Sequence, residues 1–180
     1  FNVGPQEKSE VRSRSDVITD APVLIVDDNA TNRRILLEVL KNWGMKPVAS
    51  ESADEAMLLL RQARANGTPF HLVISDVNMP DVDGFMLARR IRDDADIHLT
   101  PLIMLTSGGR SGDAVKRHEL TIAASLMKPV KQSELFDVIL SIAGDGSHPE
   151  IQVPAVTREP QKSSRALKIL LAEDNLMNQK

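Results

Sequence analysis

Four apolar runs in this sequence end in side chains that could take part in metal or phosphoryl chemistry. The polar residues at their ends are Asp27 with Asp28, then Asp76, Thr106 and Lys128. A lone Asp after a strand is most often a turn former. Four runs that end in this way predict a shared site, provided that the fold brings their ends together.

The chemistry that suits these side chains is phosphoryl transfer. Three converging carboxylates repel one another unless a cation lies among them, and an all-oxygen cluster suits Mg²⁺. Asp76 would be the nucleophile, because it stands alone after the central run, and Asp27 and Asp28 would hold the ion. Thr106 would supply a hydrogen-bond donor and Lys128 a fixed positive charge for the phosphoryl group.

The runs that precede these residues predict β-strands buried on both faces of a parallel sheet, because they are apolar and rich in β-branched residues. Strands are expected over 23–26, 46–50, 72–76, 101–106 and 125–127. Helical patterns alternate with them. The sequence therefore predicts an α/β fold with a doubly wound, five-stranded parallel sheet, and ligands bind such sheets beyond the carboxyl ends of the strands.

Capping residues and periodic apolar residues predict the helices. Asn29 or Thr31 would cap the first helix, Ser52 and Glu55 form a capping box for the second, and Ser133 would cap the last. Shorter helices are expected over 85–92 and 113–120, and the helix stops are Gly44, Gly67 and Gly144. The residues expected on the core faces of the three long helices are Ile35, Leu36, Val39, Leu40, Trp43, Ala56, Met57, Leu60, Ala63, Leu135, Ile139 and Ile142.

Composition excludes several classes of protein. Of 180 residues, 42% are hydrophobic and 26% charged, which indicates a globular chain. The net charge of −3 and the lack of a basic patch argue against nucleic-acid binding. No apolar run is long enough to cross a membrane, and the absence of cysteine excludes disulfides and thiolate metal sites. We therefore expect a cytoplasmic protein.

The flanks of the predicted domain are polar and lack an apolar period. Residues 1–20 are expected to be a linker from an upstream domain, and residues 145–166 a second linker. After it, residues 169–175 match residues 23–29 at a constant offset of 146, and Asn178 matches Asn32. Residues 167–180 are therefore expected to be the first strand and the start of the first helix of a truncated second copy.

Four features occur together in residues 21–144: the acidic pair, the D-x-x-M-P-x-x-D-G run that begins at Asp76, the Thr106 that ends a strand, and the Lys128-Pro129 dipeptide. In this combination the chain resembles a response-regulator receiver domain. The resemblance implies the flavodoxin-like receiver fold with strand order 2-1-3-4-5 and phosphorylation of Asp76 by a histidine. It also implies that Mg²⁺ binds directly to Asp28, Asp76 and the backbone carbonyl of Asn78, and through water to Asp27. Thr106 and Lys128 would contact the phosphoryl group.

The second copy, with Glu173-Asp174 in place of the acidic pair, resembles hybrid sensor histidine kinases that carry two receivers. The implied partners are a histidine-bearing dimerisation or phosphotransfer domain and the neighbouring kinase and receiver domains. The histidine donor is expected to dock on the first helix near residues 32–36 and on Pro129-Val130. The segment itself would be a phosphoacceptor with at most self-phosphorylation and autodephosphorylation.

One departure from the family pattern leaves alternatives open. Receivers usually carry Tyr or Phe three residues before the Lys, whereas this chain has Ser125 and no tyrosine. A pseudo-receiver that acts as a binding and regulatory module is therefore one alternative. The D-x-D pair of Asp81 and Asp83 makes a haloacid-dehalogenase-like phosphatase another. The bond between Lys128 and Pro129 is expected to be cis, because X-Pro bonds accept this isomer at low cost.

Overall fold

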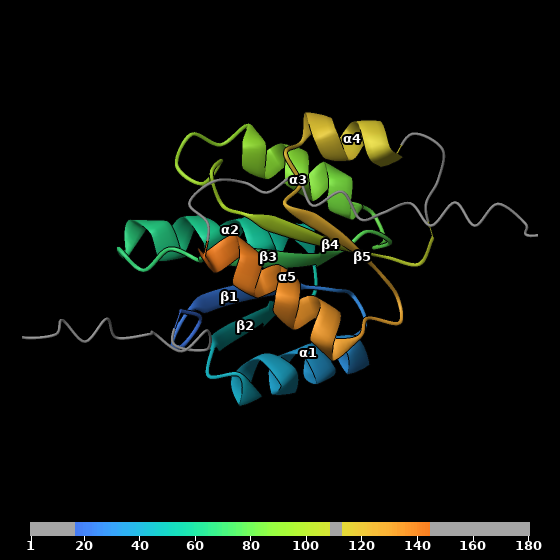
Figure 1. Ribbon diagram of the computed structural model, residues 1–180. Coiled ribbons are helices and arrows are strands. Elements are labelled where there is room, and N and C mark those ends of the chain that lie inside the picture. Colours follow the sequence, from blue (N-terminus) through green and yellow to red (C-terminus); the bar gives the residue numbers. More distant parts are fainter. Residues whose placement is uncertain (1–16, 109–112, 145–180) are drawn as a thin grey trace, which may run out of the picture.

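The computed structural model describes residues 17–108 and 113–144 and shows strands and helices in strict alternation (Figure 1). The strands are β1 (Pro22–Val26), β2 (Lys46–Ser50), β3 (Leu72–Asp76), β4 (Leu102–Thr106) and β5 (Ala124–Met127). The helices are α1 (Ala30–Asn42), α2 (Ala53–Ala65), α3 (Gly84–Arg92), α4 (Asp113–Glu119) and α5 (Gln132–Gly144).

The five strands form one parallel sheet in the order β2-β1-β3-β4-β5. This confirms the predicted fold class and strand order. In the register of the sheet, Val26 lies beside Ser75, Asp76 beside Leu105, and Thr106 beside Met127. All strands point in one direction, so the polar residues that follow them gather at a single edge.

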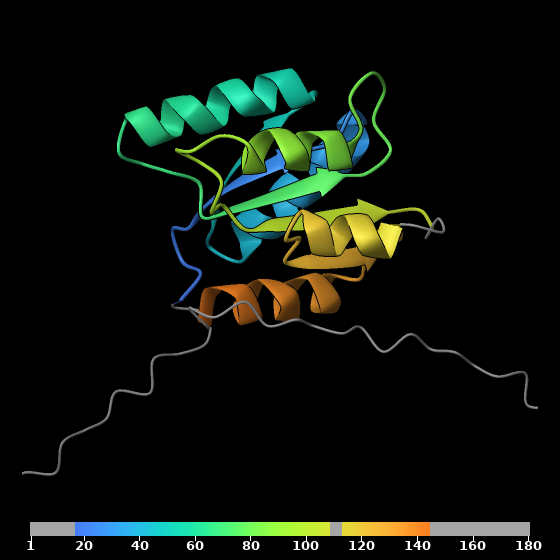
Figure 2. The same ribbon diagram turned by 90° about the horizontal axis from the view of Figure 1, so that it is seen from above.

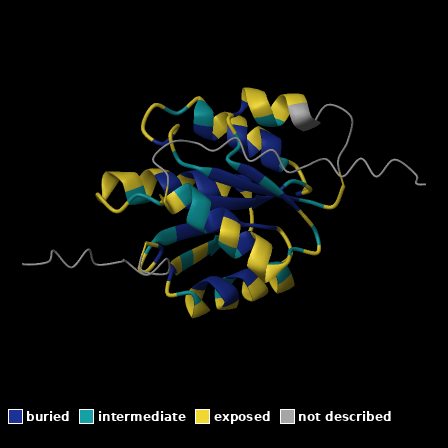
Figure 3. Ribbon diagram, viewed as in Figure 1, coloured by how far each residue is buried: buried dark blue, intermediate teal, exposed yellow. Residues whose placement is uncertain are grey.

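Each face of the sheet has its own core, because successive side chains of a buried strand point to opposite faces. On one face, α2 and α3 pack against alternate strand residues such as Leu24, Val73 and Met104. On the other face, α1 and α5 pack against the intervening residues, including Ile25 and Ile74. Figure 2 shows the helices in layers on the two sides of the sheet, and Figure 3 shows buried strands between helices with exposed outer faces.

Two details of the predicted helices are wrong. Ile35 was expected on the core face of α1, but it is 50% exposed, because Leu36, Val39 and Leu40 form the buried stripe. Ser133 was expected to cap α5, but it lies within the helix. The backbone bond from the Leu135 N–H to the Lys131 carbonyl begins the helical ladder before Ser133.

The cap predicted at Asn29 agrees with the structure, and the capping box predicted at Ser52 and Glu55 forms only in part. The Asn29 side chain accepts hydrogen bonds from the N–H groups of Thr31 and Asn32, so Asn29 and not Thr31 caps α1. The Ser52 hydroxyl accepts from the Glu55 N–H at the start of α2, but the Glu55 carboxylate accepts from the Glu51 N–H and not from the Ser52 N–H. The bond between Lys128 and Pro129 is cis, as predicted.

The folded part begins earlier than the predicted boundary at residue 21. Residues 17–20 form a turn, and Ile18 is buried in the core beneath α1 and α5. The structure does not describe residues 1–16, 109–112 and 145–180. The predicted linker over 145–166 and the predicted truncated copy over 167–180 therefore lie outside the described residues. Within the part that is described, no helix is long and apolar enough to cross a membrane.

Candidate phosphoacceptor and metal site

The carboxylates of Asp27, Asp28 and Asp76 meet at the carboxyl edge of β1 and β3. One oxygen from each lies within 4.8 Å of the others. Asp27 and Asp76 are buried and Asp28 is exposed, so the cluster opens to solvent on one side. Three carboxylates at this spacing are the donor set that a hard divalent cation prefers, which fits the Mg²⁺ predicted from the sequence.

Lys128 reaches this cluster from the end of β5. Its Nζ lies 2.8 Å from an Asp76 oxygen and 3.2 Å from an Asp27 oxygen. Burial by itself lowers the pKa of Lys128, but the hydrogen bond to Asp76 and the charges of Asp27 and Asp76 outweigh burial and hold it above its ordinary value. Lys128 therefore remains a positive charge beside both carboxylates at neutral pH.

Asp76 is held in place by its own loop. The residue is 5% exposed, and one carboxylate oxygen accepts a 3.3 Å hydrogen bond from the Asn78 N–H. Behind it, α3 begins at Gly84, where an added Cβ would overlap the Asp76 carbonyl oxygen. The close approach of Gly84 to this carbonyl explains why the turn after β3 needs a glycine.

Asp27 is fixed by the start of α1. Its carboxylate accepts a 2.8 Å hydrogen bond from the Asn29 N–H and two longer bonds from the Asn32 amide. Asn32 was expected to lie on the docking surface for a partner, and in the structure it lines the groove beside α1 while its amide group donates to Asp27. Asn32 therefore orients one of the candidate metal-binding carboxylates.

Arg33 has a role that the sequence did not indicate. Its guanidinium donates to the backbone carbonyls of Asp27 at 2.8 Å and Asp28 at 2.9 Å and lies 3.5 Å from Glu51. Its side chain is only 18% exposed. The guanidinium thus ties the loop that carries both acidic residues to the loop after β2. In the sequence, the only signal for this contact is that Arg33 follows Asp27 by six residues and Asp28 by five.

Thr106 lies at the same edge but does not contact the carboxylates in this structure. Its hydroxyl donates to the Gly108 carbonyl at 2.8 Å and accepts from the Gly108 N–H at 3.2 Å. Ser125, in place of the usual aromatic residue, is half-buried on β5 and pairs with Met104 in the register of the sheet. To donate to a phosphoryl group, the Thr106 hydroxyl would have to give up its hydrogen bond to the Gly108 carbonyl.

The D-x-D pair is not part of the carboxylate cluster. Asp83 caps α3 by accepting a 2.8 Å hydrogen bond from the Met86 N–H, and Asp81 is exposed with a positive φ of 63°. Both residues therefore serve the turn between β3 and α3. Their geometry lends no support to the phosphatase alternative.

A groove of about 510 Å³ lies beside the cluster, between α1 and the segment that joins β5 to α5. Asp27 and Lys128 are among the residues that line it. The apolar side chains along it include Ile35, Leu36, Val39, Pro129, Val130 and Leu135. The exposed Ile35 is thus a wall of this groove, which leads directly to the charged residues.

Comparisons with known proteins agree with this geometry. A family profile described as the response regulator receiver domain matches residues 23–140. The two-component response regulator ARR11 of Arabidopsis thaliana is 37% identical over 113 residues, which cover 63% of this chain and 20% of that protein. The hybrid signal transduction histidine kinase L of Dictyostelium discoideum is 29% identical over 129 residues, which cover 70% of this chain and 7% of that protein.

Solved structures are similar over the same part of the chain. The Vibrio cholerae chemotaxis protein CheY4 has a TM-score of 0.62 at 27% identity, with 68% of this chain and 98% of that chain covered. The receiver domain of a histidine kinase from Syntrophus aciditrophicus has a TM-score of 0.61 at 28% identity, with 74% and 98% covered. The chain thus spans a fifth or less of the two curated relatives named above but nearly all of these single-domain structures.

Proposed function

Because this chain belongs to the response regulator receiver domain family of two-component systems, we propose that it accepts a phosphoryl group from a histidine on Asp76. The observation that carries the proposal is the position of the Asp76 carboxylate. It is nearly buried, lies beside two further carboxylates and is paired with Lys128 at 2.8 Å. This arrangement combines a nucleophile, a cation site and a fixed positive charge.

In the proposed reaction, an Asp76 carboxylate oxygen attacks the phosphorus of a phosphohistidine. The new O–P bond forms as the P–N bond breaks, and the histidine nitrogen leaves with the electron pair. Lys128 supplies positive charge next to the attacked group, and the Thr106 hydroxyl becomes a donor to it once released from Gly108. The product is an aspartyl phosphate, so the segment acts as an acceptor rather than as a hydrolase.

Mg²⁺ is the cofactor that this donor set would hold. Asp27, Asp28 and Asp76 would bind it together with the backbone carbonyl of Asn78, and Asp27 would act through a water. When bound, the ion supplies charge neutralisation for the carboxylates and the phosphoryl oxygens. The hydrogen bonds from Asn32 to Asp27 and from Arg33 to the loop carbonyls support this role, because they fix the ligands before the ion arrives.

The groove between α1 and the β5–α5 segment is the proposed docking surface for the histidine-bearing domain. Ile35, Pro129 and Val130 line it together with Lys128 and Asp27, two residues of the charged cluster. A helix that lays an apolar face in this groove would bring its histidine toward the open side of the cluster. Arg33, which the sequence assigned to the same surface, is turned toward the loop and is not proposed as a contact.

The wider setting that we propose is a hybrid histidine kinase with two receivers in tandem. The repeat of residues 23–29 at residues 169–175 supports this arrangement, and one relative is itself a hybrid kinase. In this setting the segment would relay or regulate the signal of the kinase and contact the kinase and second receiver domains.

Acetyl phosphate with Mg²⁺ tests the proposed acceptor. We expect the chain to gain one phosphoryl group in intact-mass spectra, and Asp76→Asn to gain none. Asp81→Asn, an exposed carboxylate of the same loop, is the matched control and should be labelled like the wild type. Continued labelling of Asp76→Asn would refute the assignment. If the wild type is not labelled at all, the binding-module alternative takes its place.

A further inference from the structure

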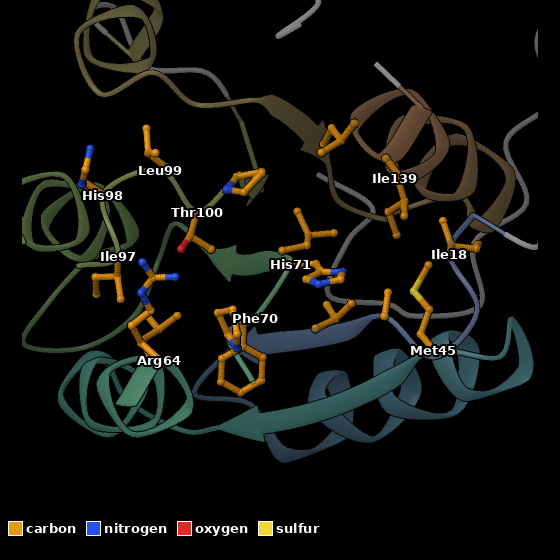
Figure 4. A pocket seen from close by; sticks show the side chains of 18 of the residues that line it. Ile18, Met45, Arg64, Phe70, His71, Ile97, His98, Leu99, Thr100 and Ile139 are labelled. Carbon is orange, nitrogen blue, oxygen red and sulfur yellow. The ribbon is translucent and has the colours of Figure 1, made fainter. Parts of the chain in front are cut away.

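A second hollow lies at the amino ends of the strands, at the edge of the sheet opposite the carboxylates. It has a volume of about 540 Å³. Its walls come from the turn before β1, the end of α2, the loops that precede β3 and β4, and the end of α5. Apolar side chains dominate the view in Figure 4, among them Ile18, Met45, Phe70, Ile97, Leu99 and Ile139.

This cavity leaves apolar side chains facing solvent at its rim. Leu99 is 76% exposed, the largest exposed fraction of any large hydrophobic residue in the described part of the chain, and Val17 is 45% exposed. A scattered exposed Leu needs no explanation. Here, however, Leu99 and Val17 line the same largely apolar cavity, so a segment that docked in it would remove apolar surface from water.

Both flanking parts of the chain start at this cavity. Val17, the first described residue, and Ala143, next to the last described residue, both line it. Any segment that continues from either end therefore starts beside the cavity. The effective concentration of such a segment is high, because the covalent link keeps it close.

The upstream segment is a poor match for an apolar cavity. Between Pro5 and Val17 it has a single apolar residue, Val11, among six charged ones: Glu7, Lys8, Glu10, Arg12, Arg14 and Asp16. Burying these charges without partners would cost more than the apolar contact returns.

The downstream segment is a better match. Residues 151–156 read Ile-Gln-Val-Pro-Ala-Val and contain no charged side chain. Ile151 follows Gly144 by seven residues, which can span up to about 25 Å when extended. Pro154 favours an extended backbone, and Ile151 and Val153 would then point to the same side. The cavity lining carries Arg64 and Asp96 together with His71 and His98, so the match rests on the apolar residues of the segment and not on charge.

We propose that residues 151–156 dock in this cavity as an extended segment against Leu99 and the end of α5. The docked segment would run along the edge of the sheet opposite Asp76 and leave the carboxylate cluster and the α1 groove open to a phosphodonor. It would also leave only residues 157–168 as a free tether between the docked segment and the repeat at residues 169–175. The docking does not depend on phosphorylation of Asp76.

Disulfide trapping tests this proposal in the full 180-residue chain, which has no cysteine of its own. Leu99→Cys combined with Val153→Cys should form an intrachain disulfide at least about tenfold faster than Leu58→Cys combined with Val153→Cys. A tenfold ratio corresponds to about 1.4 kcal/mol of docking. Leu58 is the matched control, since it is an exposed Leu on α2 outside the cavity. Adding Ile151→Asp to the first pair should reduce its rate to that of the control.

Three results would overturn the proposal. Equal rates for the two pairs would mean that the segment does not prefer the cavity. A disulfide between two chains, with a rate that rises with protein concentration, would assign the cavity to a second copy. Faster trapping of Leu99→Cys by Val11→Cys than by Val153→Cys would assign it to the upstream segment.

Discussion

The two ends of the parallel sheet carry opposite kinds of surface. At the carboxyl ends, Asp27, Asp28, Asp76 and Lys128 form a charged cluster. At the amino ends lies an apolar cavity bordered by Leu99. The same parallel topology creates both, because it collects the residues after the strands at one edge and the residues before them at the other. The residues at the two edges can therefore be altered separately.

The largest expected contrast between the two ends comes from two glycines. In Gly84→Ala, the new Cβ would meet the Asp76 carbonyl and displace the acceptor, and a shift of about 1 Å at a reacting group can slow a reaction about 100-fold. Gly67→Ala, in the turn before β3, would strain a residue with φ of +74° at a cost of about 1–2 kcal/mol.

Labelling rates with acetyl phosphate and urea unfolding midpoints check this contrast. Gly84→Ala should lose rate, and Gly67→Ala should lose stability with its rate unchanged. The idea that the close approach at Gly84 positions Asp76 fails if the two variants have the same labelling rate.

A smaller effect is expected within the charged end itself. Arg33→Ala would free the carbonyls of Asp27 and Asp28, and loss of such supporting contacts typically weakens metal binding about 10- to 100-fold. The neighbouring Arg34→Ala is the control, because Arg34 is exposed. The dependence of the labelling rate on Mg²⁺ concentration measures the apparent affinity. Identical Mg²⁺ dependence for the two variants would rule out a supporting role for Arg33.

The smallest effect is expected at the amino end, at the ion pair between Asp94 and Arg61. The hydrogen bond from Arg61 lowers the pKa of Asp94, with a further contribution from the Asp96 N–H. A lowered pKa stabilises the fold at pH values above the unfolded value of about 3.9, and this stabilisation is lost as pH falls through the folded pKa.

Asp94→Asn should therefore lower Tm at pH 7 by about one to three degrees, because the Arg61 partner is exposed to solvent and such pairs contribute little. The difference from the wild type should close as the pH falls below about 4. Asp93→Asn, a change of the adjacent exposed carboxylate, is the control. A difference that stays constant across this pH range would show that the ion pair is not its cause. Labelling of Asp76 should be unaffected.

The sequence by itself determined the sheet and the residues at its carboxyl edge. Alternating apolar runs and helical patterns specify a parallel sheet, and in such a sheet the residue that follows each strand must lie at one edge. Asp76 and Lys128 could therefore be assigned to one site although 52 residues separate them. Local signals such as the cap at Asn29 were also readable, because they depend on neighbours within one turn.

Only the tertiary structure decided which way several side chains point. The α1 pattern allowed Ile35 to be buried, but the position of α1 on the sheet buries Leu36, Val39 and Leu40 instead. Arg33 could have faced solvent, and its inward turn depends on where the loop carbonyls lie. The cavity beneath Leu99 is formed by segments from Val17 to Ala143. Contacts between residues so far apart depend on packing, which local sequence periodicity does not encode.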